Sequence, residues 1–378
     1  MKAVTYQGMK NVEVKKVDDP KIKKADDIVI RVTSTAICGS DLHLIHGMIP
    51  NLEKGYVIGH EPMGVVEEIG KGVTKVKVGD RVIIPFNIAC GTCWYCTHDL
   101  ESQCDTSNEN GEMGAYFGYS DTAGGFPGGQ AEYLRVPFAN FTPFIIPKES
   151  GVPDEKLTLL ADVMPTAYWS VDNAGVKNGD TVIVIGCGPV GLMAQKFAWL
   201  KGAKRVIAVD YIDYRLAHAK KHNKVEIVNF EAHANCGEYL KEMTKGGADV
   251  VIDCVGMSGK MTPMEFLASG LKLQGGAMGG LVLATQAVRK GGTIQVTGVY
   301  SARYNAFPLG DIFQRNVTLK TGQAPAVHYM PFLYSLIEQG KVDPGDIVTH
   351  VLPLEDAKRG YEIFDTKQDG CIKVILKP

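Results

Sequence analysis

The sequence predicts an α/β protein with two domains, one rich in β-strands and one built on a doubly wound parallel sheet. The length of 378 residues exceeds the usual size of one domain, so each of two domains can bury its own core. Short alternating runs separated by Gly and Pro occupy residues 1 to about 150, as in β-rich domains. From Asp180 onward, continuous apolar runs alternate mostly with segments of helix length, which is typical of buried parallel strands.

The strands of the β-rich domain are predicted from both ends of the chain. The N-terminus alternates like a strand, and further strands are expected in DIVIRVTSTAI, MGVVEEIG, DRVIIPF and AEYLRVP. The C-terminal part contains FPLGDIFQ, a helix-like YMPFLYSLIEQGK and a terminal strand in CIKVILK. This domain is therefore predicted to be split into residues 1–155 and 302–378, with the other domain, residues 156–301, inserted between the two parts.

The inserted domain is expected to contain a parallel sheet. Its strands are predicted in TVIVIG, RVIAVD, VEIVNF, DVVIDCVG and GTIQVTGV. The segment 257–280 lies between two of these strands and is longer than such a connection needs. It is interpreted as a functional loop or as a lid, and the sequence leaves both open.

Composition argues against several classes of partner. A formal net charge of −2 favours neither nucleic acid nor an anionic membrane. The N-terminus lacks the features of a secretion signal, and the most apolar window, TVIVIGCGPVGLMAQKFAWL, is interrupted by Gly, Pro, Gln and Lys. We therefore expect a cytoplasmic protein with no membrane span, in which the nine cysteines are reduced.

A glycine motif follows the first strand of the inserted domain. Gly186, Gly188 and Gly191 have the G-x-G-x-x-G spacing, between a strand and a helical run, that is typical of dinucleotide-binding Rossmann folds. The first glycine permits a tight turn, the second lets a pyrophosphate approach the backbone, and the third lets helix and strand pack closely. The backbone N–H groups of this turn, which includes Pro189 and Val190, are expected to face the phosphates.

The end of the next strand predicts which dinucleotide binds. Asp210 lies there, 19 residues after Gly191, where a carboxylate can accept hydrogen bonds from ribose hydroxyls and repel a 2′-phosphate. This predicts NAD rather than NADP. An alternative is that Asp210 only caps a helix that begins near Asp213. Arg215, which we include in the cofactor site, weakens the preference for NAD because it is a nearby cation.

Four cysteines form a compact candidate metal site. Cys90, Cys93, Cys96 and Cys104 are spaced C-x2-C-x2-C-x7-C in the loop IACGTCWYCTHDLESQC. Four thiolates so close in sequence can complete a tetrahedron around one Zn²⁺, which leaves no open position for a substrate. A nucleic-acid-binding zinc ribbon is disfavoured, because its cysteine pairs are usually about 15 to 20 residues apart. The loop therefore predicts a structural zinc site.

A second set of potential ligands comes from distant segments. It consists of Cys38, His60, Glu61 and Asp162. Taken singly, a buried cysteine, a core histidine or a helix-capping aspartate would explain such residues. Their occurrence together with the cysteine loop and the glycine motif favours a second metal site.

The motifs resemble those of the zinc-containing medium-chain alcohol dehydrogenases over essentially the whole chain. The resemblance rests on CGSDLH, GHEPMGVVEEIGKGV, GDRVIIP, the four-cysteine loop and IGCGPVGLMAQ. Asp162, where many family members have cysteine, and the long segment 257–280 are similar to the branch of glutathione-independent formaldehyde dehydrogenases. The resemblance implies a GroES-like catalytic domain and a Rossmann domain, with segment 257–280 covering the adenine side of a tightly held cofactor.

The resemblance also implies roles for the dispersed ligands. Cys38, His60 and Asp162 match the residues that hold a catalytic Zn²⁺ whose fourth position is left to water or substrate. Glu61 matches a carboxylate that approaches the metal and helps ligand exchange. With the cysteine loop, two Zn²⁺ ions per chain are expected, together with NAD.

Further roles follow from the same resemblance. Ser40 and His43 match the residues that pass the substrate's proton to solvent, and Thr166 matches a residue that lines the nicotinamide pocket. Residues 317–323, VTLKTGQ, match a strand that pairs across a two-fold interface, so a homodimer or homotetramer is expected. The candidates for the substrate pocket, for which core packing is the alternative, are Ile49, Phe86, Trp94 and Phe138.

These features together predict zinc-dependent hydride transfer between NAD and a small alcohol or aldehyde. Zn²⁺ lowers the pKa of a hydroxyl that it coordinates, which eases loss of hydride from the adjoining carbon, and hydrated formaldehyde suits the same chemistry. The alternatives are a polyol or L-threonine dehydrogenase of the same superfamily, a non-catalytic zinc- and nucleotide-binding protein, and a zinc-free reductase. Cys38 with His60 argues against the reductase, and the glycine motif with Ser40 argues against a non-catalytic protein.

Overall fold

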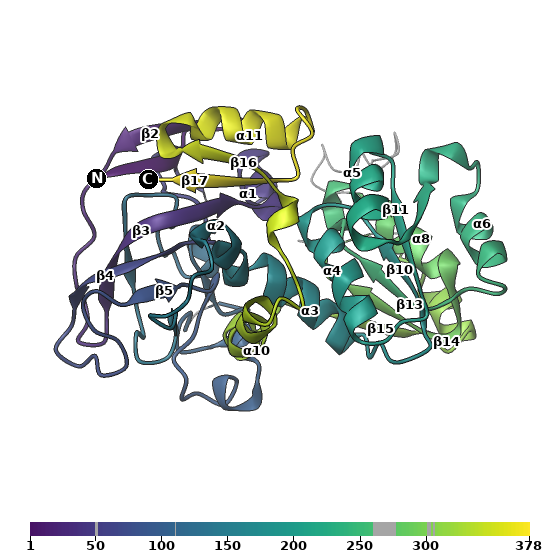
Figure 1. Cartoon of the computed structure of the whole chain (residues 1–378), viewed down its shortest axis with the longest axis horizontal. Coiled ribbons are helices and arrows are strands. Elements are labelled where there is room, and N and C mark those ends of the chain that lie inside the picture. The colour runs from purple at the N-terminus through teal and green to yellow at the C-terminus, as the bar shows by residue number, and fades with distance from the viewer. Residues whose placement is uncertain (50–51, 110, 260–276, 301–303, 305–306) are drawn as a thin grey trace. The chain divides into compact units, whose positions relative to one another are not determined.

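The structure is a computed structural model that describes residues 1–49, 52–109, 111–259, 277–300, 304 and 307–378 (Figure 1). The chain forms two compact units, Met1–Pro165 with Ala324–Pro378, and Thr166–Gln323. The second unit extends beyond the boundary predicted at residue 301, because strand β15 (Thr318–Thr321) belongs to its sheet. Of the loop predicted at 257–280, residues 260–276 lie outside the described part of the chain.

A seven-stranded sheet forms the centre of the first, β-rich unit (Figure 1). Its strands follow the order β16-β17-β3-β4-β5-β9, and β8 pairs with β3 beside that path. The pairings are antiparallel except for the parallel pair β16/β17. The strands are β3 (Ile28–Ile37), β4 (Met63–Ile69), β5 (Arg81–Ile83), β8 (Tyr133–Val136), β9 (Phe144–Ile145), β16 (Val348–Pro353) and β17 (Lys373–Lys377).

Apolar side chains that alternate along these strands form the core of the β-rich unit. In β3, Ile28, Ile30 and Val32 are buried in one cluster with Val66 and Val82, since every second side chain of a strand points to the same face. β17, from the far end of the chain, pairs antiparallel with the end of β3. The two sequence-distant parts therefore share one sheet.

Shorter elements complete this unit. The helix α11 packs against β2, β16 and β17 (Figure 1). Two small sheets pair β1 with β2 and β6 with β7. The remaining strands and the helices are β1 (Lys2–Tyr6), β2 (Val12–Lys16), α1 (Gly39–Ile45), β6 (Asn87–Ile88), η1 (Cys96–His98), η2 (Glu101–Gln103), β7 (Ala115–Tyr116), η3 (Asp121–Ala123), α2 (Asp154–Leu157), η4 (Thr158–Ala161), α10 (Ala326–Glu338), η8 (Gly345–Ile347), η9 (Leu354–Asp356) and α11 (Ala357–Asp365). Helix α3 (Val163–Asn173) spans the junction with the second unit.

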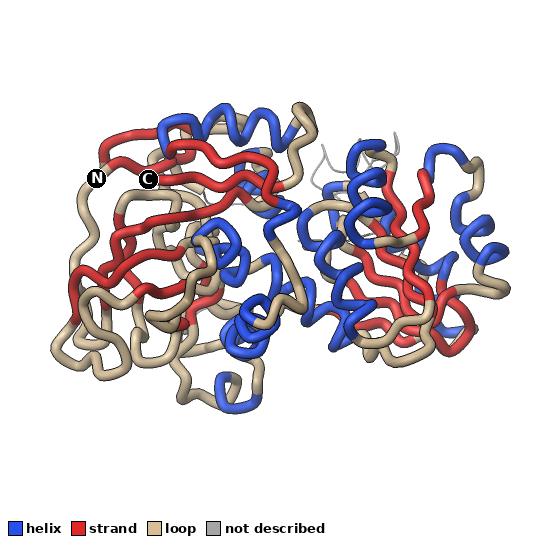
Figure 2. Tube along the Cα trace, in the orientation of Figure 1, coloured by secondary structure: helices blue, strands red, loops and turns tan. Residues whose placement is uncertain are grey.

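The second unit is built on a six-stranded sheet in which all pairings are parallel (Figure 2). Its order is β12-β11-β10-β13-β14-β15, so the chain reverses its direction of winding between β10 and β13. In such sheets the ligand site lies at this switch point, beyond the carboxyl ends of the strands. The strands are β10 (Thr181–Ile185), β11 (Arg205–Asp210), β12 (Glu226–Asn229), β13 (Ala248–Asp253), β14 (Val288–Val296) and β15.

Helices cover both faces of this sheet, which explains why its strands are apolar throughout. Figure 1 shows α4 and α5 in front of the sheet and α8 behind it, and α6 packs against α8. The helical segments are α4 (Pro189–Leu200), α5 (Asp213–His218), η5 (Ala219–Asn223), η6 (Phe230–Ala232), α6 (Cys236–Met243), η7 (Gly256–Ser258), α8 (Gly279–Ala287) and α9 (Leu309–Gln314). The predicted doubly wound sheet is confirmed. Among the described residues, no helix is both long and apolar enough to span a bilayer.

Candidate metal centres and nucleotide site

The dispersed ligands predicted from the sequence come together in the β-rich unit. Cys38 lies between β3 and α1, His60 and Glu61 precede β4, and Asp162 lies between η4 and α3. Each offers a ligand atom within 4.8 Å of the other three. The strand pairing β3/β4 holds the first two segments side by side, which is why residues so far apart in sequence share one site.

The spacing of three of these side chains fits a zinc ion. Cys38 Sγ lies 3.3 Å from Asp162 Oδ2, and His60 Nε2 lies 3.4 Å from the same oxygen. Zinc bonds of about 2.0 to 2.3 Å with tetrahedral angles place neighbouring ligand atoms about 3.3 to 3.6 Å apart. Both measured separations therefore match edges of a zinc coordination tetrahedron.

The charges of this cluster also fit a bound cation. Burial, and then the charge of Asp162, raises the pKa of the Cys38 thiol. Although burial lowers the pKa of His60, the carboxylates of Asp41 and Asp162 raise it overall to well above its usual value. Buried acidic groups at such close range are unfavourable without a countercharge, and a divalent cation stabilises a thiolate and a carboxylate together.

A carboxylate lies beside the second ring nitrogen of His60. Asp41 Oδ1 lies 3.2 Å from His60 Nδ1, while Asp41 Oδ2 accepts hydrogen bonds from the Cys38 backbone N–H at 2.9 Å and the Gln130 side chain at 3.2 Å. Such partners fix the tautomer and direction of a metal-binding histidine. Asp41 was not among the site residues predicted from the sequence, although it lies inside CGSDLH. Its position as a capping residue of α1 was the available signal.

Glu61 is held by a buried lysine. Lys373 Nζ lies 2.6 Å from Glu61 Oε1 and donates to the Ile37 carbonyl at 2.9 Å, and both charged side chains are 0% exposed. Lys373 lies in β17, which the sequence identified only as a terminal strand. In the sequence, the signal for this pair was the charged residue Lys373 within an apolar strand.

Both residues of the predicted proton relay, Ser40 and His43, lie on α1. Ser40 Oγ is 3.2 Å from Cys38 Sγ and 3.3 Å from His60 Nε2. His43 is buried, and burial lowers its pKa to about 4, so its imidazole is neutral at pH 7. Thr166 lies in α3. The roles of all three residues stay predictions.

Two aromatic rings flank His60. The rings of Phe86 and Tyr119 both lie 6.4 Å from the His60 ring, edge to face. The Tyr119 hydroxyl is buried and has no hydrogen-bond partner among the described residues, and the sequence analysis missed it. Of the other pocket candidates, Trp94 is 60% exposed and stacks on His98. Phe138 packs against the core of the β-rich unit, and Ile49 is buried.

The four predicted cysteines form the second candidate metal centre. Cys90 Sγ and Cys96 Sγ are 3.9 Å apart, and Cys93 Sγ and Cys104 Sγ are 3.8 Å apart. Zn–S bonds of about 2.3 Å in a tetrahedron give S–S edges of about 3.8 Å. A hydrogen bond between Cys96 and Cys104 lowers the pKa of the Cys104 thiol to about 4 and raises the pKa of the Cys96 thiol, so the two sulfurs share one proton when no cation is bound.

The glycine motif forms the turn between β10 and α4. Gly186 has φ +96°, and a Cβ on Gly191 would lie 1.9 Å from the Gly186 carbonyl oxygen, so the fold itself requires both glycines. At Gly188, in contrast, the nearest atom to a Cβ would be Arg215 Nη1 at 3.9 Å. The space beside Gly188 is therefore open, as the approach of a pyrophosphate to the backbone demands.

Asp210 ties this turn to the end of β11. Its Oδ2 accepts a hydrogen bond from Cys187 N at 2.6 Å, and its Oδ1 accepts from Tyr211 N at 2.6 Å and Ile212 N at 3.0 Å. These donors precede α5, which begins at Asp213. The carboxylate is thus fixed beside the glycine turn and does not cap the first turn of α5.

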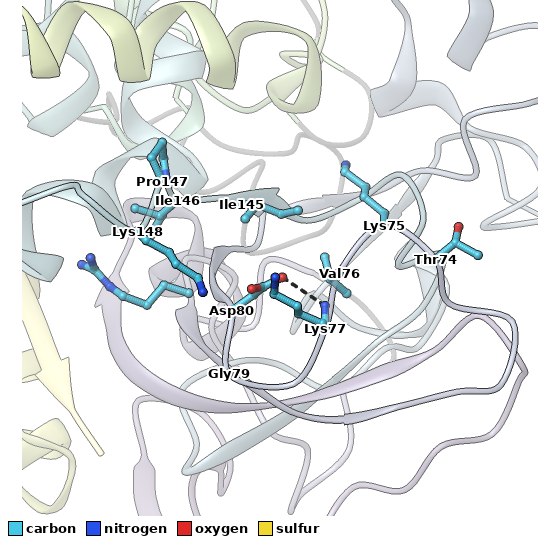
Figure 3. Close-up of a pocket in the computed structure, with 11 residues that line it drawn as sticks. Thr74, Lys75, Val76, Lys77, Gly79, Asp80, Ile145, Ile146, Pro147 and Lys148 are labelled. Atoms are coloured by element: carbon cyan, nitrogen blue, oxygen red, sulfur yellow. Dashed lines mark hydrogen bonds between the residues drawn. The ribbon is translucent and has the colours of Figure 1, made fainter.

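A separate hollow of about 640 Å³ lies on the β-rich unit between residues 74–81 and 145–148 (Figure 3). None of the predicted site residues lines it. The Lys75 ammonium donates to the Phe141 and Pro143 carbonyls at 2.8 Å, and Arg81 is paired with Asp154. Lys75 and Arg81 are thus engaged by the protein itself, and Lys77 and Lys148 also line the hollow.

Comparison with protein families assigns the class of protein. Residues 24–148 match the alcohol dehydrogenase GroES-like domain, and residues 189–270 match the zinc-binding dehydrogenase family. Both matches coincide with the units that carry the candidate metal centres and the glycine motif. They define a zinc-binding dehydrogenase.

Similar proteins extend over the whole chain. An uncharacterized zinc-type alcohol dehydrogenase-like protein of Bacillus subtilis is 74% identical over 100% of both chains. A glutathione-independent formaldehyde dehydrogenase of Pseudomonas aeruginosa is 36% identical, covering 96% of this chain and 94% of the relative. The solved alcohol dehydrogenase of Thermus sp. ATN1 has a TM-score of 0.85 and 36% identity, covering 100% of this chain and 99% of that one.

The chain belongs to the zinc-type alcohol dehydrogenase family. The predicted fold class, the resemblance and the assignment as a zinc-dependent oxidoreductase with a nicotinamide cofactor are confirmed. The family acts on small alcohols and aldehydes.

Proposed function

We propose that this protein catalyses the reversible, NAD-dependent oxidation of a small primary alcohol at a zinc ion held by Cys38, His60 and Asp162. Formaldehyde, as its hydrate, is a further substrate of the same site. The observation that carries the proposal is the spacing of the three ligand atoms, 3.3 and 3.4 Å about Asp162 Oδ2, which suits a tetrahedral zinc with one open position.

The chain's own residues prepare the site for this reaction. When bound, Zn²⁺ lowers the pKa of a coordinated substrate hydroxyl, and NAD accepts the hydride from the adjoining carbon. Ser40, whose Oγ lies between Cys38 Sγ and His60 Nε2, accepts the substrate's proton while passing on its own. Neutral His43 relays the proton toward solvent by accepting it at one ring nitrogen while the other ring nitrogen releases its own, so no charged imidazolium has to persist. Asp41 keeps His60 directed at the metal.

A substrate panel tests the proposed function. We expect short primary alcohols with NAD, and formaldehyde with NAD, to give NADH at rates well above those with polyols or L-threonine. NADH formation is followed by absorbance with purified enzyme at saturating cofactor. Turnover confined to a polyol or to L-threonine would reject the proposed substrate class, and the absence of turnover with all substrates would reject catalysis.

NAD is proposed as the cofactor on the basis of Asp210 and the glycine turn. A carboxylate at the end of β11, aligned beside the turn by Cys187 N, suits two ribose hydroxyls and repels a 2′-phosphate. Arg215, next to Gly188, is proposed to add charge attraction to the pyrophosphate.

Replacing Asp210 should change the preference between cofactors. A hydrogen bond to a charged group contributes about 1.5 to 3 kcal/mol, so Asp210→Ser should lower the ratio of kcat/KM for NAD over NADP by at least about tenfold. Asp213→Ser, a carboxylate at the start of the neighbouring helix α5, is the matched control and should keep the ratio. An unchanged ratio in Asp210→Ser would contradict the ribose role.

We further propose that the protein is a homodimer or homotetramer joined through β15. This strand is the last in its sheet, so its outer edge is available for pairing, and Leu309 (63% exposed) and Phe313 (80% exposed) of the preceding α9 are apolar. Sedimentation velocity at micromolar concentration measures the assembly, and a monomer would contradict this proposal.

A further inference from the structure

A third cluster of potential metal ligands lies in the β-rich unit, apart from both predicted zinc sites. Asp99, Glu101 and His328 each offer a ligand atom within 4.8 Å of the other two. Asp99 follows η1 and Glu101 begins η2, both in the four-cysteine loop, whereas His328 lies in the first turn of α10. α10 packs directly against η2, so the trio bridges two segments that are far apart in sequence.

Glu101 is the residue that points to a ligand. It is only 3% exposed, and its Oε2 has no hydrogen-bond partner among the described residues. A buried carboxylate costs considerable free energy unless a donor or a cation compensates it. Glu101 therefore brings to the cluster a buried carboxyl group with one oxygen that has no partner among the described residues.

The other two members suit completion of a metal site from the solvent side. His328 Nδ1 lies 3.1 Å from Asp99 Oδ1, and these side chains are 41% and 72% exposed, respectively. Water can thus supply the remaining ligands. Two carboxylates balance the charge of a divalent ion, and the imidazole nitrogen favours a transition metal over Ca²⁺ or Mg²⁺, which prefer oxygen alone.

We propose that Asp99, Glu101 and His328 form an additional binding site for a divalent transition-metal ion, which ties α10 to the four-cysteine loop. The bound ion neutralises the buried Glu101 carboxylate. It is exchangeable, because Asp99 and His328 are exposed and leave coordination positions to water, whereas four thiolates complete the coordination at the four-cysteine site.

Titration of the holoenzyme with Zn²⁺ tests the proposal. The tightly held zinc is first counted by elemental analysis, and Zn²⁺ binding is then measured by calorimetry. We expect one further ion per chain, bound at least about tenfold more weakly in His328→Gln and in Glu101→Gln, since loss of even an outer partner of a ligand costs about 10 to 100-fold in affinity. The count of tightly held zinc should stay the same in both variants.

His350→Gln is the matched control, because His350 also pairs with one carboxylate, Asp369, at 3.3 Å. It should bind the further ion as the wild type does. Added Zn²⁺ should also raise the Tm of the wild type and of His350→Gln, since an ion that binds only the folded state stabilises it. It should raise the Tm of His328→Gln less.

Three outcomes would overturn the proposal. One is the absence of a further ion, and another is equal affinity in the wild type, Glu101→Gln and His328→Gln, which would indicate scattered surface binding. The third is an affinity loss of equal size in His350→Gln. Because His328 is partly exposed on a helix, we expect His328→Gln to fold normally. This variant therefore tests the proposal even if Glu101→Gln folds poorly.

Discussion

Asp162→Ala should lower kcat/KM by at least about a thousandfold. Lewis-acid catalysis by a metal contributes several kcal/mol to transition-state stabilisation, and each 1.4 kcal/mol or so is a factor of ten in rate. Asp162 Oδ2 lies at 3.3 and 3.4 Å from the other two proposed ligands, so removing it opens the coordination set. Steady-state kinetics together with zinc counting measures both consequences, with two ions per chain expected in the wild type and one in the variant.

Asp162→Cys is the matched variant for this experiment. Cysteine is the residue that many family members carry at this position, and a thiolate also binds zinc. We expect it to keep two zinc ions per chain and a large part of the activity. Full activity in Asp162→Ala, or equal zinc content in Asp162→Ala and the wild type, would show that the ligand assignment is wrong.

Residues whose chemistry is carried by a local motif were predictable from the sequence. The four-cysteine loop encodes its site in the spacing of its own residues, and the apolar strands around Gly186 encode a parallel sheet. Cys38, His60 and Asp162 are dispersed, and their spacing does not connect them. Their occurrence beside the other motifs and the family resemblance did so before the structure placed their ligand atoms within 4.8 Å of one another.

Features that depend on long-range pairing were not predictable in the same way. Lys373 reaches Glu61 only because β17 pairs with the end of β3, and nothing in the segment CIKVILK identifies its partner. The membership of β15 in the parallel sheet depends on pairing too, because this short, partly exposed strand gives no strong apolar signal of its own. Local patterns thus define elements and motifs, whereas the partners of single buried charges follow from sheet register.

We expect the Glu61–Lys373 pair to contribute strongly to the free energy of unfolding. Both side chains are 0% exposed and 2.6 Å apart, so each charge relies on the other for compensation in a medium of low polarity. Lys373→Met keeps the length of the side chain but leaves the Glu61 carboxylate buried beside Asp162 and without its cation. Breaking such a pair costs about 3 to 5 kcal/mol of folding free energy.

Lys377→Met is the matched control in the same strand. Lys377 pairs with Glu155 at 2.7 Å, but these side chains are 31% and 34% exposed, and partly exposed pairs contribute about 0 to 1 kcal/mol. Urea unfolding of the zinc-loaded protein should therefore separate the two variants clearly. The double variant Glu61→Gln/Lys373→Met should recover most of the loss, because it leaves no uncompensated charge. Equal stability of Lys373→Met and Lys377→Met would mean that burial does not govern the strength of this pair.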